Sequence, residues 1–450
     1  MIAVQTLRDA DLKHLWHPYT DITVLESSLY VCFERGEGVY LYDTEGNAVL
    51  DGISSWWATA LGHGHPRVVQ AIREQAGLLQ QSILGNQSHP KAVELAEKLA
   101  AFTPEGLDHC YFAADGASAT EAAMKMAIQY WWNIGDTGRT KFVCLEDGYH
   151  GDTLGAVGVG FVPAFHAPFK DAIVPHYFAP APYYDGPSED GRDAEAARVA
   201  FKGMERIVAE HHRELAGVIL EPLVQGAAGI RIYDPEYLVK VRTLCDSYNL
   251  LLIADEIAVG FGRTGALFAC GAAGITPDIL CLGKALSAGY LPISAAIATT
   301  KVFETFRNES GRLEVGGTKR DRTFYDGHTY CGNPICAAAA IAALEIYADE
   351  DIVGQCSGTS RLLREGFAEL GRHPAIAYHK SIGMIGMVKF RPEFGAVFAR
   401  KVKERAYDLG LLIRPLGDVL YLWPPLISSE SELEAMLTKF SAALDVASED

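Results

Sequence analysis

Several features are scarce or missing in this sequence of 450 residues, and each absence narrows the class of protein. No apolar run approaches the roughly 20 residues that a membrane-spanning helix requires. Basic residues are few, with 39 Lys and Arg against 57 Asp and Glu, so the formal net charge is −18. That charge would repel nucleic acid, and we interpret it mainly as a source of solubility. The composition favours a globular protein that binds neither nucleic acid nor membrane.

Cysteine pairs with the spacing of metal ligands are also missing. The nine cysteines are odd in number and irregularly spaced, and none forms a CxxC pair. This pattern predicts no zinc site and is typical of a reducing, cytoplasmic compartment. Residues 1–16 contain early acidic residues and no long apolar stretch, so we expect neither a signal peptide nor a transit peptide.

The middle of the chain alternates short apolar runs with segments of helical periodicity. The apolar runs span 142–145, 217–220, 250–254 and 279–282, and helical spacing occurs over 194–212 and 235–248. The alternation predicts an α/β fold in which helices cover both faces of a mostly parallel sheet. Ligands bind beyond the carboxyl ends of such strands, so polar residues that follow these runs are candidate site residues.

The two ends of the chain show a different pattern. Residues 29–51 resemble an antiparallel meander, and short strands are predicted at 384–390 and 419–423. A chain of this length suits a large domain with a smaller lobe. We predict one smaller α+β lobe built from both termini, and the boundaries are 1–75 and 341–450 for the lobe and 76–340 for the large domain. The stretch 185–193 is interpreted as a surface loop.

Two ionisable residues follow predicted strands directly. Asp255 ends the run 250–254, and a buried carboxylate is costly unless it is paired. It would suit the protonated nitrogen of a pyridine cofactor, although a helix cap or a metal ligand is equally compatible with Asp255 alone. Lys284 follows the run 279–282, where burial would lower its pKa and leave the free amine that imine formation requires. A lysine that reaches from a strand end to water is the alternative, but the acid and the amine in one sheet together favour a cofactor site.

A turn of small residues opens a predicted helix just after residue 115. Gly116, Ala117 and Ser118 would leave free backbone N–H groups for a phosphate, with the Ser118 hydroxyl as a further donor. A plain helix cap explains the same residues equally well. Tyr149 follows the run 142–145, where its ring would either stack on a flat cofactor or pack in the core.

The run from Asp255 to Gly265, Asp-Glu-Ile-Ala-Val-Gly-Phe-Gly-Arg-Thr-Gly, with Gly283-Lys284 downstream, closely resembles the class III pyridoxal-phosphate aminotransferases. The resemblance covers nearly the whole chain and implies the fold type I architecture. It also implies that Lys284 holds pyridoxal 5′-phosphate as a Schiff base, with Asp255 on the pyridine nitrogen. The remaining cofactor contacts implied by the resemblance are Tyr149 on the ring and Gly116, Ala117 and Ser118 on the phosphate.

The segment 327–334 is similar to one that, in this class, reaches the phosphate site of the neighbouring subunit. The resemblance implies a homodimer in which His328 and Thr329 complete the phosphate site of a second copy. It also implies that Gly327 lines the substrate site.

Within the class, four segments are similar to the branch that converts 8-amino-7-oxononanoate to 7,8-diaminononanoate in biotin synthesis. They are residues 14–20, 51–57, 148–153 and 413–417. The resemblance implies that Tyr19, Trp56 and Trp57 shape the substrate pocket and that Arg414 binds the carboxylate of the keto acid, which a planar guanidinium suits. Core packing of the tryptophans and a structural role of Arg414 are the alternatives.

The sequence also departs from the class in places. The phosphate turn lacks a hydroxyl at its first position. Residues 288–293 and 327–330 resemble relatives that take the amino group from lysine more than those that use S-adenosylmethionine, so the amino donor stays open. Two other functions remain as alternatives: an ω-amino-acid or diamine transaminase of the same class, and a cofactor-free binding protein on the same fold.

Overall fold

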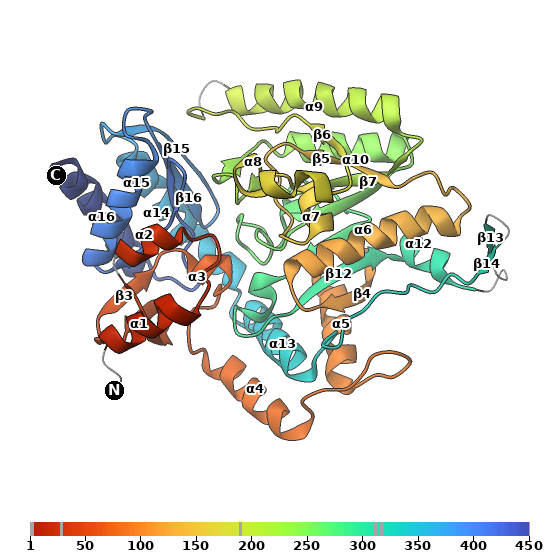
Figure 1. Ribbon diagram of the computed structural model, residues 1–450, viewed down its shortest axis with the longest axis horizontal. Helices are drawn as coiled ribbons and strands as arrows, with labels where there is room; N and C mark the ends of the chain where they lie inside the picture. The colour runs from red at the N-terminus through yellow and green to blue at the C-terminus, as the bar shows by residue number, and fades with distance from the viewer. Residues whose placement is uncertain (1–3, 28–29, 189–190, 309–312, 316–317, 450) are drawn as a thin grey trace.

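A sheet of seven strands forms the centre of the larger lobe of the computed structural model, which describes residues 4–27, 30–188, 191–308, 313–315 and 318–449 (Figure 1). In spatial order the strands are β4 (Leu107–Ala113), β12 (Ser294–Thr299), β11 (Ile279–Leu282), β10 (Leu251–Asp255), β7 (Leu215–Leu220), β5 (Lys141–Leu145) and β6 (Tyr177–Ala179). Strand β12 runs antiparallel to both of its neighbours, and the other pairs are parallel. The predicted α/β fold with a mostly parallel sheet is confirmed, and the four predicted apolar runs all form strands of it.

Helices cover both faces of this sheet, and the side chains of β10 alternate between two apolar cores. Leu251 and Ile253 pack in the core that contains α6 (Gly116–Asn133). Leu252 and Ala254 point the other way, into the core that contains α9 (Arg192–His211), α10 (Glu236–Ser247) and α13 (Pro334–Asp349). A strand that is buried on both faces has apolar side chains at successive positions, which explains why the sequence shows continuous apolar runs here.

The smaller lobe contains residues from both ends of the chain, which lie together on one side of the molecule in red and blue (Figure 1). One sheet joins β1 (Phe33–Glu37), β2 (Tyr40–Asp43), β3 (Ala48–Asp51) and β17 (Leu411–Leu412). A second sheet joins β15 (Ile376–Ile382), β16 (Ile385–Phe390), β19 (Val419–Leu422) and β18 (Pro415–Leu416). Because β17 pairs with β3, the two termini share a sheet. The boundaries at residues 75 and 340 stay a prediction.

The other described elements are helices of varied length, short 3₁₀ turns and short strands. They are α1 (Val4–His14), α2 (Ile22–Ser27), α3 (Ser54–Trp57), α4 (Pro66–Leu78), α5 (Pro90–Phe102), α7 (Leu154–Val159), α8 (Pro163–His166), η1 (Ala167–Ala172), β8 (Val224–Gln225), β9 (Arg231–Ile232), α11 (Ala269–Ala272), η2 (Lys284–Ser287), α12 (Thr300–Phe303), η3 (Glu304–Phe306), β13 (Leu313–Val315), β14 (Thr318–Arg320), α14 (Ile352–Leu370), α15 (Gly395–Asp408) and α16 (Glu430–Glu449). Among the described residues, no helix has the length and apolar character needed to cross a bilayer.

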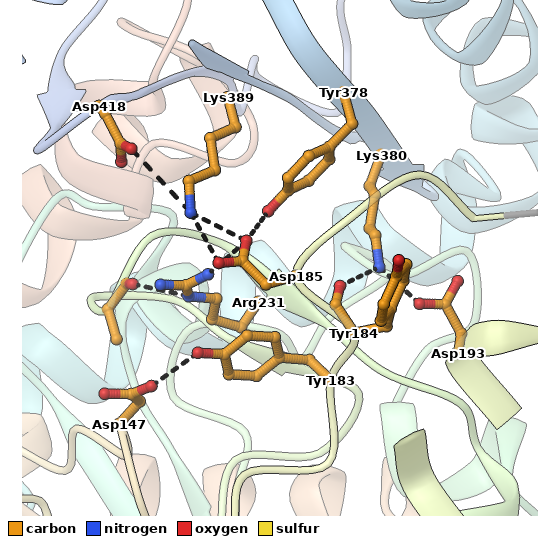
Figure 2. Close-up of polar contacts among 11 residues, drawn as sticks. Asp147, Tyr183, Tyr184, Asp185, Asp193, Arg231, Tyr378, Lys380, Lys389 and Asp418 are labelled. Atoms are coloured by element: carbon orange, nitrogen blue, oxygen red, sulfur yellow. Dashed lines mark hydrogen bonds and ion pairs between the residues drawn. The ribbon is translucent and has the colours of Figure 1, made fainter. Parts of the chain in front are cut away.

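A polar cluster ties the larger lobe to the smaller one (Figure 2). Asp185, which follows β6, accepts hydrogen bonds from Tyr378 and Lys389 on the strands β15 and β16 and forms an ion pair with Arg231. The stretch that contains Asp185 was predicted as a surface loop. Its residues 189–190 lie outside the described residues, but its first residue makes an interlobe contact.

Candidate active site

Lys284 and Asp255 lie at the carboxyl ends of two adjacent parallel strands, as the sequence predicted. Asp255 is the last residue of β10, and Lys284 follows β11 with a positive φ of 43°. Both side chains line one cavity of about 520 Å³. Burial lowers the pKa of Lys284, while the carboxylates of Asp255 and Glu221 act in the opposite direction. The lysine therefore faces the cavity instead of reaching along the surface, and its amine is easier to deprotonate than that of a surface lysine.

Asp255 is held by a buried histidine. Its Oδ2 lies 2.7 Å from His150 Nδ1, and its Oδ1 accepts a hydrogen bond of 3.0 Å from the backbone of Ile257. Burial disfavours a charged His150, but its hydrogen bond and charge interaction with Asp255 prevail and raise the histidine pKa. His150 Nε2 is buried and has no hydrogen-bond partner among the described residues. These two contacts fix the Asp255 carboxylate at the cavity wall, where a protonated pyridine nitrogen could pair with it.

A second buried carboxyl group, Glu221, lies beside this pair, and the sequence interpretation missed it. Its oxygens accept hydrogen bonds of 2.9 Å from the backbone N–H groups of Tyr149 and Gly226. Burial raises the pKa of Glu221 to about 7, and its attraction to His150 only partly opposes that rise. Glu221 directly follows β7, so the strand-end argument that selected Asp255 would have found it.

The start of α6 forms another wall of the cavity. Gly116 and Ala117 line it, and a Cβ added at Gly116 would come within 3.1 Å of Ile257. Ser118 does not line the cavity, because its backbone N–H and its hydroxyl both donate to the carboxylate of Asp115, at 2.9 and 2.8 Å. The helix start therefore offers backbone donors at the cavity wall, where the lack of a Cβ at Gly116 lets Ile257 pack closely, but the carboxylate of Asp115 already caps it.

Tyr149 also lines the cavity and belongs to a hydrogen-bonded group with Asp152 and Tyr19. Its hydroxyl donates to Asp152 Oδ2 at 2.8 Å, and the hydroxyl of Tyr19 donates to Asp152 Oδ1 at 2.5 Å. Burial and the bond to Asp152 raise the pKa of Tyr19 to about 12, and burial also raises the pKa of Tyr149, so both phenols stay protonated. Asp152 was not among the predicted site residues, although it lies inside the quoted segment 148–153.

The two adjacent tryptophans take different environments. Trp57 is 4% exposed, stacks on Trp423 at 5.0 Å and has Lys284 Nζ 5.1 Å from its ring centre. Trp56 is 39% exposed, and the guanidinium of Arg414 lies 4.3 Å over its ring. Trp57 therefore bounds the cavity at the amine, whereas Trp56, Arg414 and Tyr19 do not line it. Trp56 connects to the cavity through Tyr19, whose ring lies 5.9 Å from it and whose hydroxyl donates to Asp152 on the cavity wall.

The backbone that presents these indoles is left-handed. Four consecutive residues of α3, Ser54 to Trp57, have φ between 44° and 72°. This conformation costs about 1–2 kcal/mol for each residue other than glycine. Such a turn persists only where surrounding contacts hold it, and strained backbone of this kind clusters at functional sites.

Gly327, His328 and Thr329 lie on an exposed loop and do not line the cavity of their own chain. The carbonyl of Thr329 accepts a hydrogen bond from Gln81, and the backbone N–H of His328 donates to Cys331 at 3.3 Å. The structure thus does not bring the three residues to Lys284 within one chain. Their contribution to a second copy stays a prediction.

The residues around the cavity fit pyridoxal phosphate. A buried amine, a carboxylate fixed by a histidine and a helix start with free N–H groups are the three groups that would hold its aldehyde, ring nitrogen and phosphate. His150, which lines the cavity, has a buried Nε2 with no hydrogen-bond partner among the described residues, as expected of a site that takes a polar occupant.

Comparison with known proteins identifies the family of the chain. The model of the family "Aminotransferase class-III" matches residues 22–444, and the chain belongs to that family, whose members use pyridoxal 5′-phosphate. The chain is 38% identical over 444 residues, 96% of each chain, to the adenosylmethionine-8-amino-7-oxononanoate aminotransferase of Geobacter sulfurreducens. The crystal structure of the enzyme with that name from Methanocaldococcus jannaschii superposes with a TM-score of 0.90, at 33% identity over 99% of both chains. The omega transaminase of Pseudomonas jessenii in complex with PMP also gives 0.90, at 28% identity over 98% of both chains. The predicted fold type I architecture, family and cofactor are confirmed.

Proposed function

We propose that the protein transfers an amino group to 8-amino-7-oxononanoate and forms 7,8-diaminononanoate, the step of biotin synthesis that the sequence resemblance implied. The observation that carries the proposal is the position of Arg414. Its guanidinium lies 4.3 Å over Trp56, whose ring contacts Tyr19 next to the cavity-lining Asp152, and no carboxylate forms an ion pair with Arg414 in the described part of the chain. A fatty-acid-like keto acid needs such a cation at some distance from the amine, with an apolar wall between them, which Trp56 and Trp57 supply.

Pyridoxal phosphate supplies an electron sink that stabilises negative charge on the carbon next to the transferred nitrogen. The side chain of Lys284 would hold the cofactor and, once its amine is free, accept the proton from the α-carbon of the donor and return one to the acceptor. Asp255 and His150 would keep a proton on the ring nitrogen. Trp57 would keep water away from the Lys284 amine on one side of the cavity.

The amino donor is either S-adenosylmethionine or lysine. Asp152 places a carboxylate at the mouth of the cavity, where it accepts from Tyr19 and Tyr149. Each donor carries a positive charge in addition to its reacting amino group, so Asp152 suits both. Separate reactions of 8-amino-7-oxononanoate with each donor would identify the one that yields diaminononanoate. Failure with both would contradict the proposed acceptor.

The runner-up function is an ω-amino-acid or diamine transaminase of the same family. The superposition on the omega transaminase of Pseudomonas jessenii favours this alternative. Parallel assays of diaminononanoate formation and of β-alanine and putrescine transamination would distinguish the two. A purified protein that binds no pyridoxal phosphate would instead indicate a binding protein on the same fold.

The active form is proposed to be a homodimer. Exposed apolar side chains surround the loop 327–329, with Leu78 80%, Ile83 61% and Tyr330 64% exposed. Contacts of Gln81 and Asn333 hold this loop next to the end of α4, so the apolar side chains and the loop lie on one surface. Sedimentation of the cofactor-saturated protein tests this proposal, and an active monomer would contradict it.

A further inference from the structure

Asp51 is a buried carboxylate at the end of β3, and its oxygens form hydrogen bonds with residues of the stretch 53–63, which follows directly. Its Oδ1 accepts from the backbone N–H groups of Ile53 and Ser55, at 3.3 and 2.9 Å. Its Oδ2 accepts from the hydroxyls of Ser55 and Thr59, at 2.8 and 3.4 Å, and lies 2.9 Å from His63 Nε2. The side chain is fully buried, with 0% exposure. A buried carboxylate is this well satisfied only while the chain keeps the conformation that aims those donors at it.

That conformation is the left-handed turn of α3. The Asp51 carboxylate accepts from Ser55 inside the turn, and the hydroxyl of Ser54 donates to the carbonyl of Trp423 at 2.7 Å from the other side. The turn is thus fixed between the first sheet of the smaller lobe and the chain just after β19. None of its four residues is a glycine, so the hydrogen bonds to Asp51 and to Trp423, and not the intrinsic preference of these residues, hold its backbone.

The turn determines where both indoles lie. Trp57 is turned inward against Trp423 and the amine of Lys284, while Trp56 is turned outward under Arg414. If the turn relaxed to a right-handed one, each side chain would leave from a different side of the backbone, and neither pair of contacts would survive. The geometry of the pocket wall therefore depends on the contacts that hold the left-handed backbone.

We propose that Asp51 is a positioning residue of the active site: its carboxylate holds the left-handed turn that sets Trp57 against Lys284 and Trp56 against Arg414. The inference rests on the proposed function in one respect, namely that these two indoles bound the substrate site. Asp51 itself touches neither indole ring nor the Lys284 amine, so its effect on the reaction is indirect.

The test compares Asp51→Asn with Asp278→Asn in the holoenzyme. Asp278 is a matched control, because it is also a buried carboxylate that accepts from a backbone N–H, that of Leu252, but it lies at the opposite end of the strands from the cavity. Both variants should melt at a lower temperature. Only Asp51→Asn should lose much of the near-ultraviolet circular dichroism of the tryptophans and raise KM for the keto acid about tenfold or more, with a smaller change in kcat. Equal changes in both variants would overturn the proposal.

A second variant keeps the test decisive if Asp51→Asn does not fold. Ser55→Ala removes one hydroxyl of the turn and leaves the Asp51 carboxylate in place, so KM and circular dichroism should change in the same direction by less. Wild-type values for both would overturn the proposal. If the wild-type protein does not use 8-amino-7-oxononanoate, the proposed function fails, but the circular dichroism comparison still tests the role of Asp51.

Discussion

His150 Nδ1 lies 2.7 Å from Oδ2 of Asp255, and both side chains are almost fully buried, at 2% and 5% exposure. Glu221 and the amine of Lys284 lie close enough to act on the charges of this pair. Four ionisable groups therefore share one poorly solvated space, and the charge of each depends on the others. This coupling should be visible in the pH dependence of stability.

Glu221 should make the protein less stable as the pH rises. Burial raises the pKa of Glu221 in the folded protein to about 7, from an ordinary value of 4.5. The folded state keeps this proton to a higher pH than the unfolded state, so the stabilisation is complete below about pH 4.5 and is lost as the pH rises through about 7. The shift corresponds to a free energy on the order of 3 kcal/mol. Unfolding by urea between pH 5 and pH 8 should show this loss.

Glu221→Gln should reduce the pH dependence. The raised pKa of His150 acts in the same direction and should remain in the variant. Glutamine has one acceptor oxygen where the carboxyl group has two, so the substitution itself changes stability. The free energy of unfolding of the variant is therefore compared between pH values and not with that of the wild type at a single pH. Equal pH slopes in variant and wild type would contradict the assignment.

Lys284→Ala should abolish amino transfer and the visible absorbance of the bound cofactor. The variant loses both the attachment point and the proton carrier, and the loss of the proton carrier alone costs about 10²- to 10⁴-fold in rate. Lys301→Ala is the control, because Lys301 also follows a strand of the central sheet but is 49% exposed and pairs with Asp278. An unchanged spectrum in Lys284→Ala would exclude this lysine as the cofactor residue.

Asp115→Asn should bind the cofactor more tightly than the wild type. Asparagine caps a helix as well as aspartate does, so the side-chain oxygen at position 115 still accepts from the backbone N–H of Ser118. The negative charge at the start of α6 disappears. A charge at a helix terminus contributes about 0.3–1 kcal/mol, which corresponds to about a two- to fivefold gain in affinity for pyridoxal phosphate. Calorimetric titration of both proteins with the cofactor, and with inorganic phosphate alone, measures this difference in affinity. Weaker phosphate binding by the variant would show that Asp115 does not oppose the anion.

The fold and the two central residues could be predicted because parallel strands buried on both faces have a simple sequence pattern. Asp255 and Lys284 each follow such a run, and neighbouring parallel strands bring their carboxyl ends together. Strand β4 was not predicted as a whole, since its pattern mixes buried residues with the exposed Asp108. The left-handed turn of α3 could not be predicted, because its conformation depends on contacts with residues as distant as Trp423.

Arg414→Ala should remove the preference for an acceptor with a free carboxylate. A hydrogen bond between charged partners contributes about 1.5–3 kcal/mol, so kcat/KM for 8-amino-7-oxononanoate should fall about 10- to 100-fold. The methyl ester of the same acceptor lacks the charge, and its kcat/KM should change much less. The ratio of kcat/KM for the acid to that for the ester, measured on each variant, isolates the carboxylate contact from any general damage to the pocket.

Two further variants complete this measurement. Arg414→Lys keeps the charge but not the planar pair of donors, so its ratio should be intermediate. Arg231→Ala removes an arginine of the interlobe cluster and should leave the ratio at the wild-type value (Figure 2). If Arg414→Ala kept the wild-type ratio, the carboxylate of the acceptor would bind elsewhere. The stacking of Arg414 on Trp56 would then be structural, and the case for a long-chain keto acid would lose its main support.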